Sequence, residues 1–378
     1  MCKNWIIILL PLWILPIQGC DLPESSAQGT STPVVRLNHI QMLASHNSYK
    51  EAIEPALFSR LMEEDSSRFF GLEYHHISLK DQLDLGIRKL EVDIVYDPEG
   101  GRYAKPLGLS MLADMGVETQ PYDPDKLMEQ PGFKVLHVQD IDFRSNCLTL
   151  EACLGEILAW SEAHPNHLPI AISFNAKDSR IERPGFVLPL PFTSTAFDSL
   201  DQALLSVLPK NKLLTPDEVR GDYTSLEEAV LSRGWPQLDA VRGKILFVLD
   251  EGGKKLEAYV AGHPSLENRV MFVNAQPGRP EAAFLIMNNP IRDHDLIQER
   301  VKLGYLVRTR ADANTIEARR NDYSRFEAAL SSGAHYITTD YYVPNPAFGT
   351  DYQISFPAGK IALCNPLYQD VCKNMIIE

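Results

Sequence analysis

The sequence lacks two features that would suggest a nucleic-acid partner or a membrane-spanning protein. It has 36 lysine and arginine residues against 50 aspartate and glutamate residues, so its formal net charge is −14. Proteins that bind nucleic acid, or that grip anionic membranes by charge, carry a positive excess, so we expect neither kind of binding. The longest apolar run, residues 5–17, is far shorter than the roughly 20 residues of a membrane-spanning helix. An acidic chain remains compatible with a site that collects a cation.

The first twenty residues are typical of an export signal and not of a folded segment. Lys3 gives a small positive start, and residues 5–17 suit the apolar part of a signal peptide. The stretch that ends at Cys20 is similar to a bacterial lipoprotein cleavage site, with Cys20 as the lipidated first residue, although Gln18 is atypical there. Ordinary cleavage nearby is the alternative. We therefore expect an exported protein, either a cell-envelope lipoprotein or a secreted one.

The rest of the chain divides into a linker and one large domain. Residues 21–36 are rich in serine, threonine, glycine and proline, which predicts a flexible tether. Residues 37–378 show no repeats or low-complexity blocks, and their length suits one large barrel. We interpret them as a single catalytic domain that ends in a disulfide-bearing tail.

Cysteine is scarce, with six in 378 residues. Two of them, Cys2 and Cys20, lie in the expected signal segment. The other four form two close pairs, and export would permit disulfides. Neither pair has the two-residue spacing of a zinc knuckle. Local bridges are the simplest of the possible pairings, and they would be Cys147–Cys153 and Cys364–Cys372.

Short apolar strands alternate with helical patterns along residues 37–378. The expected strands are 38–44, 87–95, 133–138, 169–174, 244–249, 305–309 and 335–339, with one more at either 270–273 or 283–287 and the other of these two an irregular addition. The expected helices are 78–85, 150–163, 197–208, 293–303 and 323–330. Residues 97–131 read as a long insertion. This alternation predicts an α/β fold, and about eight units favour a (β/α)8 TIM barrel with loop insertions over a doubly wound sheet.

Polar residues gather where the first three expected strands end. Enzymes with this barrel place their catalytic groups at the carboxyl ends of the strands. His46 and Asn47 end the first strand, and His137 ends the third. Glu91 and Asp93 lie late in the second strand, and their spacing of two residues points both side chains to the same face. We take these five residues as the centre of the candidate site.

Later strands add further polar residues at the same edge. Asn175 ends the fourth strand and Lys177 lies just beyond it, while Arg308 and Asp340 end the last two strands. Asn175 is a candidate metal ligand, and Lys177, Arg308 and Asp340 are candidates for substrate binding. The remaining histidines, among them the pair at 75–76 before a helix, lack this placement, and we expect no catalytic role for them.

Two histidines around a carboxylate and amide cluster suit the cleavage of a phosphodiester. One histidine can take the proton of an attacking hydroxyl, and the other can protonate the leaving alkoxide. A divalent cation can stabilise the charge that develops on the phosphate oxygens. Carboxylate and amide oxygens are hard ligands, which favour Ca²⁺ or Mg²⁺ over zinc. The alternative is that Glu91 and Asp93 merely neutralise lysines inside the barrel mouth.

Four segments at these strand ends resemble the calcium-dependent bacterial phosphatidylinositol-specific phospholipase C family. They read SHNSY at 45–49, QLDLGIRKLEVD at 82–93, GFKVLH at 132–137 and PIAISFNAKD at 169–178. The resemblance runs from about residue 37 to residue 341, and the segments are specific when taken together and in order. It implies a phospholipase C-like TIM-barrel phosphodiesterase that splits phosphatidylinositol into diacylglycerol and a cyclic inositol phosphate.

The resemblance also assigns roles to individual residues. His46 and His137 match the family's two catalytic histidines, and Asn47, Glu91 and Asp93 match its calcium ligands. Family members usually have a glutamate at the end of the fourth strand, where this chain has Asn175. An asparagine can still coordinate through its amide oxygen, but the site loses one negative charge. The resemblance implies Ca²⁺ as the cofactor, ahead of Mg²⁺, and the missing charge predicts weaker binding of the ion than in a site with three carboxylates.

Two other functions remain open. A glycerophosphodiester phosphodiesterase would share the barrel and the strand-end chemistry, with a glycerol hydroxyl or water as nucleophile. A surface lipoprotein could have kept the barrel only to bind lipid after losing the glutamate at position 175. The presence of both His46 and His137 favours an enzyme over this second alternative.

The loop after the fourth strand bears on how a lipid substrate would be reached. It is rich in proline, which disfavours a helix or a central strand there. Its apolar side chains either pack back onto the barrel or form a rim that dips into a membrane surface. These side chains are Phe186, Val187, Leu188, Leu190 and Phe192.

Overall fold

The computed structural model describes Met1 and residues 34–372. The expected signal segment, its Cys20 and most of the expected tether lie outside the described residues. The last tether positions do have partners in the fold, because the Val35 carbonyl accepts a hydrogen bond of 2.9 Å from Leu238 N and Arg36 forms a β-bridge with Gln237. No helix of the described residues has the length and apolar content to cross a membrane.

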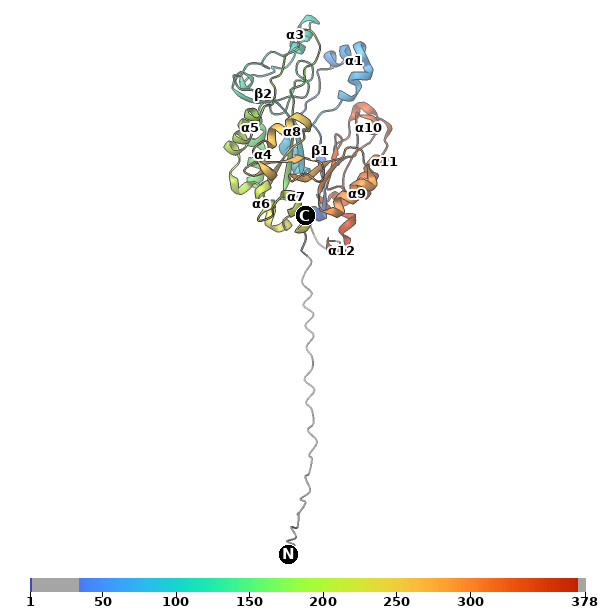
Figure 1. Ribbon diagram of the computed structural model, residues 1–378. Helices are drawn as coiled ribbons and strands as arrows, with labels where there is room; N and C mark the ends of the chain where they lie inside the picture. Colours follow the sequence, from blue (N-terminus) through green and yellow to red (C-terminus); the bar gives the residue numbers. More distant parts are fainter. Residues whose placement is uncertain (2–33, 373–378) are drawn as a thin grey trace. The chain divides into compact units, whose positions relative to one another are not determined.

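Eight parallel strands form a closed barrel, which confirms the predicted (β/α)8 fold. Figure 1 shows helices lying around these strands. The ring runs β1, β2, β4, β5, β6, β7, β8 and β9 and closes where β9 pairs with β1 and Ala44 of β1 pairs with Lys89 of β2. Strands buried on both faces are nearly continuous apolar runs, as β5 and β7 are here, whereas β2 and β8 also carry charged residues. Their bounds are β1 (Ile40–Ser45), β2 (Lys89–Asp97), β4 (Ile170–Ala176), β5 (Ile245–Leu249), β6 (Met271–Asn274), β7 (Ala282–Ile286), β8 (Leu306–Arg310) and β9 (Tyr336–Thr339).

One expected barrel strand lies outside the ring. β3 (Gly132–Val135) pairs antiparallel with the end of β2, so that Gly132 opposes Asp97, and β2 pairs directly with β4. The expected third strand is therefore wrong as a barrel strand. The insertion after Asp97 returns the chain beside the strand it left, and such a return gives antiparallel pairing.

A second error compensates for the first. Only one of the segments 270–273 and 283–287 was expected to join the barrel, but both do, as β6 and β7. Residues 275–281 connect them without a helix, so the strand–helix alternation gave no sign of two neighbouring strands. The total of eight strands is right because one strand is lost at β3 and one is gained here.

The helices follow the predicted pattern, with ends set by local capping. Ser78 and Thr149 accept hydrogen bonds from Asp81 N and Ala152 N at the starts of α2 and α4, as good N-cap residues do. Gly304 ends α9 with a φ of 115°, which a glycine adopts readily. The bounds are α1 (Pro55–Phe69), α2 (Leu79–Asp84), α3 (Leu107–Asp114), α4 (Leu150–Ala163), α5 (Ser194–Val207), α6 (Pro216–Arg220), α7 (Leu226–Ser232), α8 (Gly253–Val260), α9 (His294–Leu303), α10 (Ile316–Arg320), α11 (Ser324–Ser332) and α12 (Gln369–Cys372).

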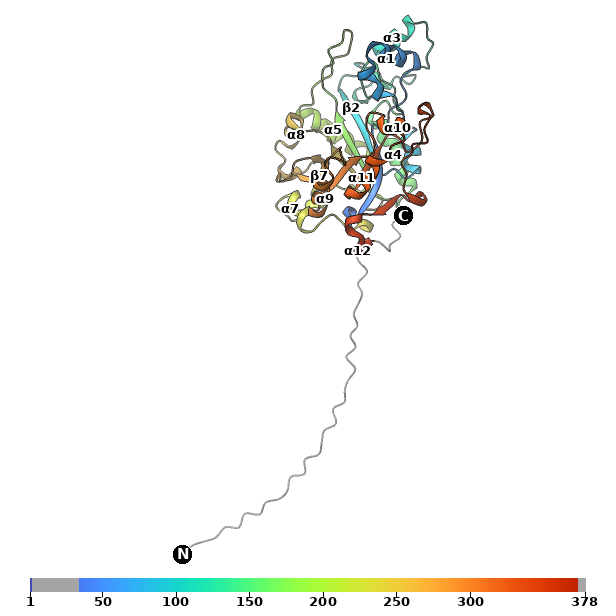
Figure 2. The same ribbon diagram turned by 90° about the vertical axis from the view of Figure 1, so that its right-hand side faces the viewer.

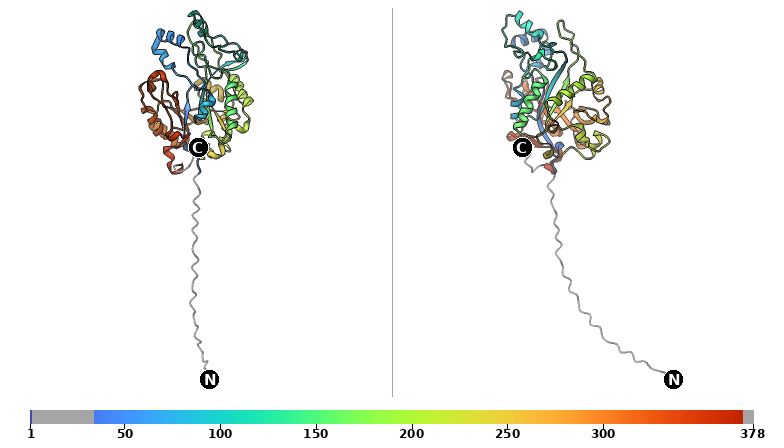
Figure 3. Two further views of the ribbon diagram at one scale, coloured as in Figure 1. Left: turned by 180° about the vertical axis from the view of Figure 1, so that it is seen from behind. Right: turned by 90° about the vertical axis from the view of Figure 1, so that its left-hand side faces the viewer.

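The two ends of the barrel differ in what covers them. Helices α1 and α3 contact each other and lie together at the end where the strands terminate, as the three ribbon figures agree (Figure 1, Figure 2 and Figure 3). At the opposite end, β10 (Ala362–Cys364) pairs antiparallel with β1 and leads into α12. The insertions therefore build up the carboxyl end, where the site is expected.

Both expected disulfides are present. Cys147 bonds to Cys153 and Cys364 bonds to Cys372, which confirms the local pairing. The first bridge joins the loop after β3 to α4, and the second closes the C-terminal tail. Two such bridges fit an extracellular protein.

The proline-rich loop after β4 divides between core and surface. Phe192 is only 4% exposed, and its ring packs on those of Phe133 and Phe197. It is therefore a core residue, and the idea that it belongs to an exposed rim is wrong. Leu188, by contrast, is 57% exposed, and Phe186 is half-buried.

Candidate active site

The carboxyl ends of the barrel strands surround a polar hollow of about 490 Å³. Of the residues that the sequence singled out, all but Asp340 line it. Three further residues that were not chosen as site residues line it too. The lining residues are His46, Asn47, Glu91, Asp93, His137, Asn175, Lys177, Asp250, Asn288, Arg308 and Arg310.

Asp340 lies behind His46 and holds its ring. Because β1 and β9 pair with Ser45 beside Thr339, the residues that follow each strand are neighbours. The His46 Nδ1 atom is 3.0 Å from Asp340 Oδ1, so the carboxylate accepts a hydrogen bond from Nδ1–H. This fixes the tautomer and leaves Nε2 free to act as a base. Nε2 lies 3.7 Å from Glu91 Oε1.

The environment of His46 favours the neutral ring. Burial lowers its pKa first, and the nearby Arg310 guanidinium lowers it further, while the Asp340 and Glu91 carboxylates act in the opposite direction. Arg310 Nη2 is 3.4 Å from Asp340 Oδ2, so this cation also pairs with the residue that orients the ring. A neutral imidazole with a fixed tautomer is the form that can accept a proton.

His137 has a carboxylate partner of its own. It follows β3, in a tight loop where Val138 and Asp142 pair as a β-bridge. Its Nδ1 atom is 2.7 Å from Asp142 Oδ2, and Asp142 Oδ1 is 3.2 Å from the buried Lys50 ammonium. The ring of Tyr74 lies between the two histidines, with its centroid 5.7 Å from that of His46 and 6.2 Å from that of His137. Both histidines are thus oriented by carboxylates.

Glu91 is an ionised carboxylate inside the barrel mouth. Its Oε2 atom accepts hydrogen bonds from Lys89 Nζ at 2.8 Å and from Arg308 Nη2 at 2.7 Å. Burial raises its pKa, but the two cations outweigh burial and hold the pKa well below its usual value. The alternative that this residue neutralises a lysine is therefore realised in part, since one of its oxygens is fully used.

Asp93 has one paired and one unpaired oxygen. Its Oδ2 atom is 3.1 Å from Lys177 Nζ, and this carboxylate raises the pKa of Lys177. Its Oδ1 atom is buried and has no hydrogen-bond partner among the described residues. A buried carboxylate oxygen normally has a partner, so this atom is open to a ligand.

The two amides complete a set of oxygen donors. Asn175 opposes Asp93 in the pairing of β4 with β2, and its Nδ2 donates to Glu91 Oε1 at 3.3 Å. Asn47, whose backbone has a φ of 45°, donates from Nδ2 to the Tyr74 hydroxyl at 2.7 Å. Each amide oxygen is left to accept. The set therefore has two carboxylates and two amides. Within residues 34–372, no three His, Cys, Asp or Glu side chains are grouped for a metal ion.

The sequence matches a known family of enzymes. The family described as "Phosphoinositide phospholipase C, Ca2+-dependent" matches residues 35–366. The chain belongs to this family. Its members are phosphodiesterases, and the enzyme described here is one of them. The resemblance seen in the four strand-end segments is thereby confirmed, and no curated protein matches the chain significantly in sequence.

Solved structures share the fold of the enzyme. A calcium-dependent phosphoinositol-specific phospholipase C from Pseudomonas sp. is 17% identical with a TM-score of 0.53, over 87% of this chain and 95% of that chain. A Ca²⁺-dependent phosphatidylinositol-specific phospholipase C from Streptomyces antibioticus is 17% identical with a TM-score of 0.51, over 84% and 98%. At such identities, the likeness shows a common barrel.

The structure adds residues of the enzyme that sequence reasoning missed. Asp250 and Asn288 each follow an expected strand, so the strand-end rule that selected the other residues would have found them. Burial raises the pKa of Asp250 to about 6, and the Glu91 charge adds to this. The Oδ1 atom of Asn288 accepts a hydrogen bond from Arg308 Nη1.

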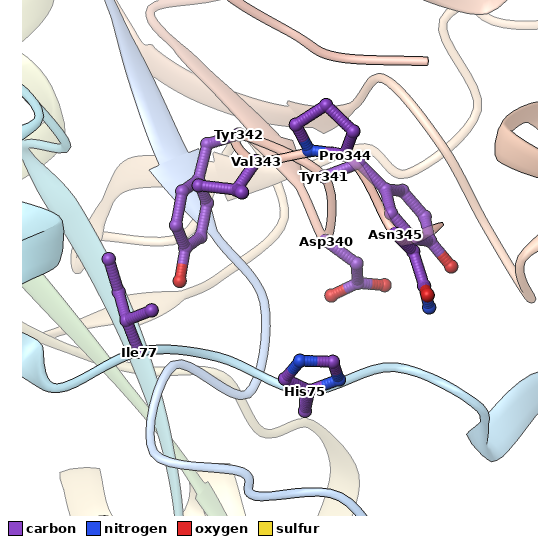
Figure 4. Close-up of a pocket in the computed structure, with 8 residues that line it drawn as sticks. All are labelled: His75, Ile77, Asp340, Tyr341, Tyr342, Val343, Pro344 and Asn345. Atoms are coloured by element: carbon purple, nitrogen blue, oxygen red, sulfur yellow. The ribbon is translucent and has the colours of Figure 1, made fainter. Parts of the chain in front are cut away.

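His76 could not have been found by that rule, because it precedes a helix. It is buried, and its Nε2 atom is 3.6 Å from Asp340 Oδ1. Its Nδ1 atom is 3.0 Å from the Tyr342 hydroxyl. Figure 4 shows Asp340 from this side, in a second hollow between residues 75–77 and 341–345, with its carboxylate facing His75. Asp340 is therefore the centre of a cluster that reaches beyond the active-site hollow.

Proposed function

We propose that this enzyme is a calcium-dependent phosphatidylinositol-specific phospholipase C that releases diacylglycerol and a cyclic inositol phosphate. The observation that carries the proposal is the pairing of two histidines with two separate carboxylates on the rim of one polar hollow. His46 is paired with Asp340 at 3.0 Å, and His137 is paired with Asp142 at 2.7 Å. This arrangement suits one proton transfer on each side of a phosphorus atom.

In the proposed reaction, His46 is the general base. Its Nε2 atom takes the proton from the inositol hydroxyl next to the phosphate, and that oxygen forms a new bond to phosphorus. The bond between phosphorus and the glycerol oxygen breaks, and His137 donates its proton to that leaving oxygen. Asp142 stabilises the protonated His137 ring before transfer, and Asp340 stabilises the imidazolium that forms on His46. In a second step, His137 would take a proton from water while His46 returns its proton to the inositol oxygen. The water oxygen then bonds to phosphorus and the cyclic phosphate opens.

Positive side chains would receive the phosphate and the headgroup. Lys177, Arg308 and Arg310 line the hollow, and they lie close to the two carboxylates of β2 or to Asp340. We propose that Lys177 and Arg308 contact substrate, as the sequence analysis expected. Asp340, which was expected to contact substrate, is better placed to orient His46.

The donor set fits a calcium ion. Asn47, Glu91, Asp93 and Asn175 would hold it through oxygen atoms, and the unpaired Oδ1 of Asp93 is the strongest single indication. A bound Ca²⁺ would supply positive charge for the phosphate oxygens. Mg²⁺ demands a stricter octahedral arrangement, which a set of mixed carboxylates and amides satisfies less readily.

A phospholipid panel with phosphorus NMR of the products tests the proposal. We expect cleavage of phosphatidylinositol, a cyclic phosphate signal and loss of turnover when Ca²⁺ is chelated. Cleavage of glycerophosphoinositol with no cleavage of phosphatidylinositol would instead favour a glycerophosphodiester phosphodiesterase. Lipid binding without any turnover would favour the non-catalytic alternative.

We also propose that the enzyme is exported, with Cys20 as a lipidation site and a membrane surface as its working environment. The two disulfides and the apolar segment at residues 5–17 support export. The exposed Leu188 supports contact with a lipid surface. Mass spectrometry of the mature N-terminus tests this proposal, because a Cys20→Ser variant should lose the lipid mass. A mature protein that keeps residues 1–19 would contradict it.

A further inference from the structure

An apolar groove of about 520 Å³ lies beside the active-site hollow. Its walls come from three parts of the chain that are distant in sequence: the end of α1 and the turn after it, the loop after β3, and the loop after β4. The apolar residues that line it are Phe69, Leu72, Val138, Ile141, Ile181 and Phe186. None of them lines the polar hollow.

The loop after β3 belongs to both the hollow and the groove. Val138 N donates to Asp142 O at 3.1 Å, and Asp142 N donates back to Val138 O at 2.9 Å, so residues 138–142 form a closed turn. The His137 ring lines the hollow, held by the Asp142 side chain, while Val138 and Ile141 line the groove. A molecule in the groove therefore lies against the same turn that carries His137.

Polar contacts hold the groove's outer wall in place. Arg183 forms two hydrogen bonds of 2.9 Å with Glu64 of α1, and its guanidinium covers the Phe186 ring at 5.4 Å. Asp140 accepts from Val187 N at 2.7 Å and from Leu107 N at 2.8 Å, which ties the β4 loop to the β3 loop and to α3. Soluble monomers rarely expose large apolar patches, and those that they do expose often mark binding sites. Here the loop after β4 is held to α1 by Arg183 and to the β3 loop by Asp140, and the groove between them stays open.

We propose that this groove binds the first methylenes of an acyl chain on the lipid's leaving group. This inference rests on the proposed function and deepens it. His137 would protonate the glycerol oxygen, and the chains attached to that glycerol begin a few bonds away. The groove lies against the turn that carries His137, so a chain on the leaving group has an apolar surface within its reach. Arg68 also borders it, and its guanidinium group suits an ester carbonyl of the lipid.

The proposal predicts a chain-length effect on monomeric substrate. Burying one methylene favours binding by about fourfold. The ratio of kcat/KM between dihexanoyl and dibutyroyl phosphatidylinositol, each below its aggregation concentration, should therefore be well above one for the full-length protein. The ratio should level off for longer chains, once the groove is filled.

Two substitutions test the groove, and one matched substitution serves as the control. Phe186→Ser with Ile181→Ser should bring the dihexanoyl to dibutyroyl ratio toward one. Turnover of an inositol phosphodiester with a methyl leaving group should be unchanged, which also shows that the variant is folded. Leu188→Ser, in the same loop but outside the groove, should leave the ratio at the wild-type value.

The outcomes separate the groove from its alternatives. A wild-type ratio in the double variant overturns the proposal, and so does an equal loss in the Leu188→Ser variant, which would indicate general surface contact. If the double variant does not fold, Ile181→Trp fills the groove instead and should penalise dihexanoyl more than dibutyroyl substrate. Equal kinetics on both substrates would then overturn it. If the wild-type enzyme cleaves no phosphatidylinositol of any chain length, it is the proposed function that fails.

Discussion

His46 and His76 face the same oxygen of one carboxylate. Asp340 Oδ1 lies 3.0 Å from His46 Nδ1 and 3.6 Å from His76 Nε2. Burial raises the pKa of Asp340, but His46, His76 and Arg310 outweigh burial and hold it well below its usual value. The carboxylate is therefore charged, and the two rings share it. His76 is a positioning residue in this arrangement, because it acts on His46 through Asp340.

The first prediction concerns the two catalytic histidines. His46→Ala and His137→Ala should each lower kcat by about 10² to 10⁴, the usual effect of losing a general base or acid. Steady-state kinetics on a soluble substrate measures this, and circular dichroism shows that each variant is folded. If either variant keeps near-full turnover, the two-histidine mechanism is wrong.

The second prediction concerns His76. A His76→Phe variant keeps an aromatic ring against Tyr342, whose ring centroid is 5.5 Å away, but leaves Asp340 without its imidazole partner at position 76. We expect kcat to fall by about 10- to 100-fold with little change in KM, because the His46 ring loses part of its orientation.

A pH profile separates this role from a purely structural one. Without His76, the Asp340 carboxylate is shared between His46 and Arg310 and stabilises the His46 imidazolium more strongly, so the acid limb of kcat/KM should move to higher pH. An unchanged acid limb in the His76→Phe variant would refute the positioning role. Tyr342→Phe, which removes only the hydroxyl that His76 contacts, is the milder comparison.

The third prediction concerns the pH dependence of the wild-type enzyme. The base must be neutral, and burial and Arg310 lower the pKa of His46 below the ordinary value of 6.5. Activity should therefore persist as the pH falls through 6.5, and be lost only at lower pH. Arg310→Met removes one of the two causes, so its acid limb should move up. The profile of kcat/KM reports this for the free enzyme, and a downward movement would contradict the assignment.

The fourth prediction concerns residue 175. Asn175→Glu adds a third carboxylate next to Glu91 and Asp93, so it should tighten Ca²⁺ binding. Calorimetry with Ca²⁺ measures the change, and Asn175→Gln is the control that keeps the neutral amide. No gain in affinity for the glutamate variant would mean that residue 175 is not a ligand.

The fifth prediction concerns Lys177. Its ammonium lies 3.1 Å from Asp93 Oδ2 and competes with a cation for that carboxylate. Lys177→Met should therefore tighten Ca²⁺ binding in calorimetry, while turnover falls if the ammonium also contacts the phosphate. Weaker Ca²⁺ binding in this variant would show that Lys177 instead supports the cation site.

The candidate site could be predicted from the sequence wherever position along a strand decided it. His46, Glu91, Asp93 and Asn175 were placed correctly in the hollow, because parallel strands bring their carboxyl ends to one edge. Asp250 obeys the same rule and was overlooked.

Other features depend on contacts between segments that are distant in the sequence, and the pattern of one segment does not predict such contacts. His76 reaches Asp340 from a loop that precedes α2, far from Asp340 in the sequence. The antiparallel course of β3 depends on where a long insertion returns, and an apolar run reads the same in either direction. The likeness of Phe186 and Phe192 in sequence likewise conceals that one is half-buried and the other lies in the core.

The place of β3 has a consequence for how such an enzyme can change. β3 pairs with β2 alone, so the eight-strand ring closes without it. The proposed base is carried by the ring itself, whereas the proposed acid is carried by an appendage attached to the ring's outer edge. Insertions and substitutions in that appendage can alter which alcohol is released without disturbing barrel closure. The choice of headgroup, which the proposed function assigns to residues at the ends of the ring strands, would then be inherited separately from the choice of leaving group.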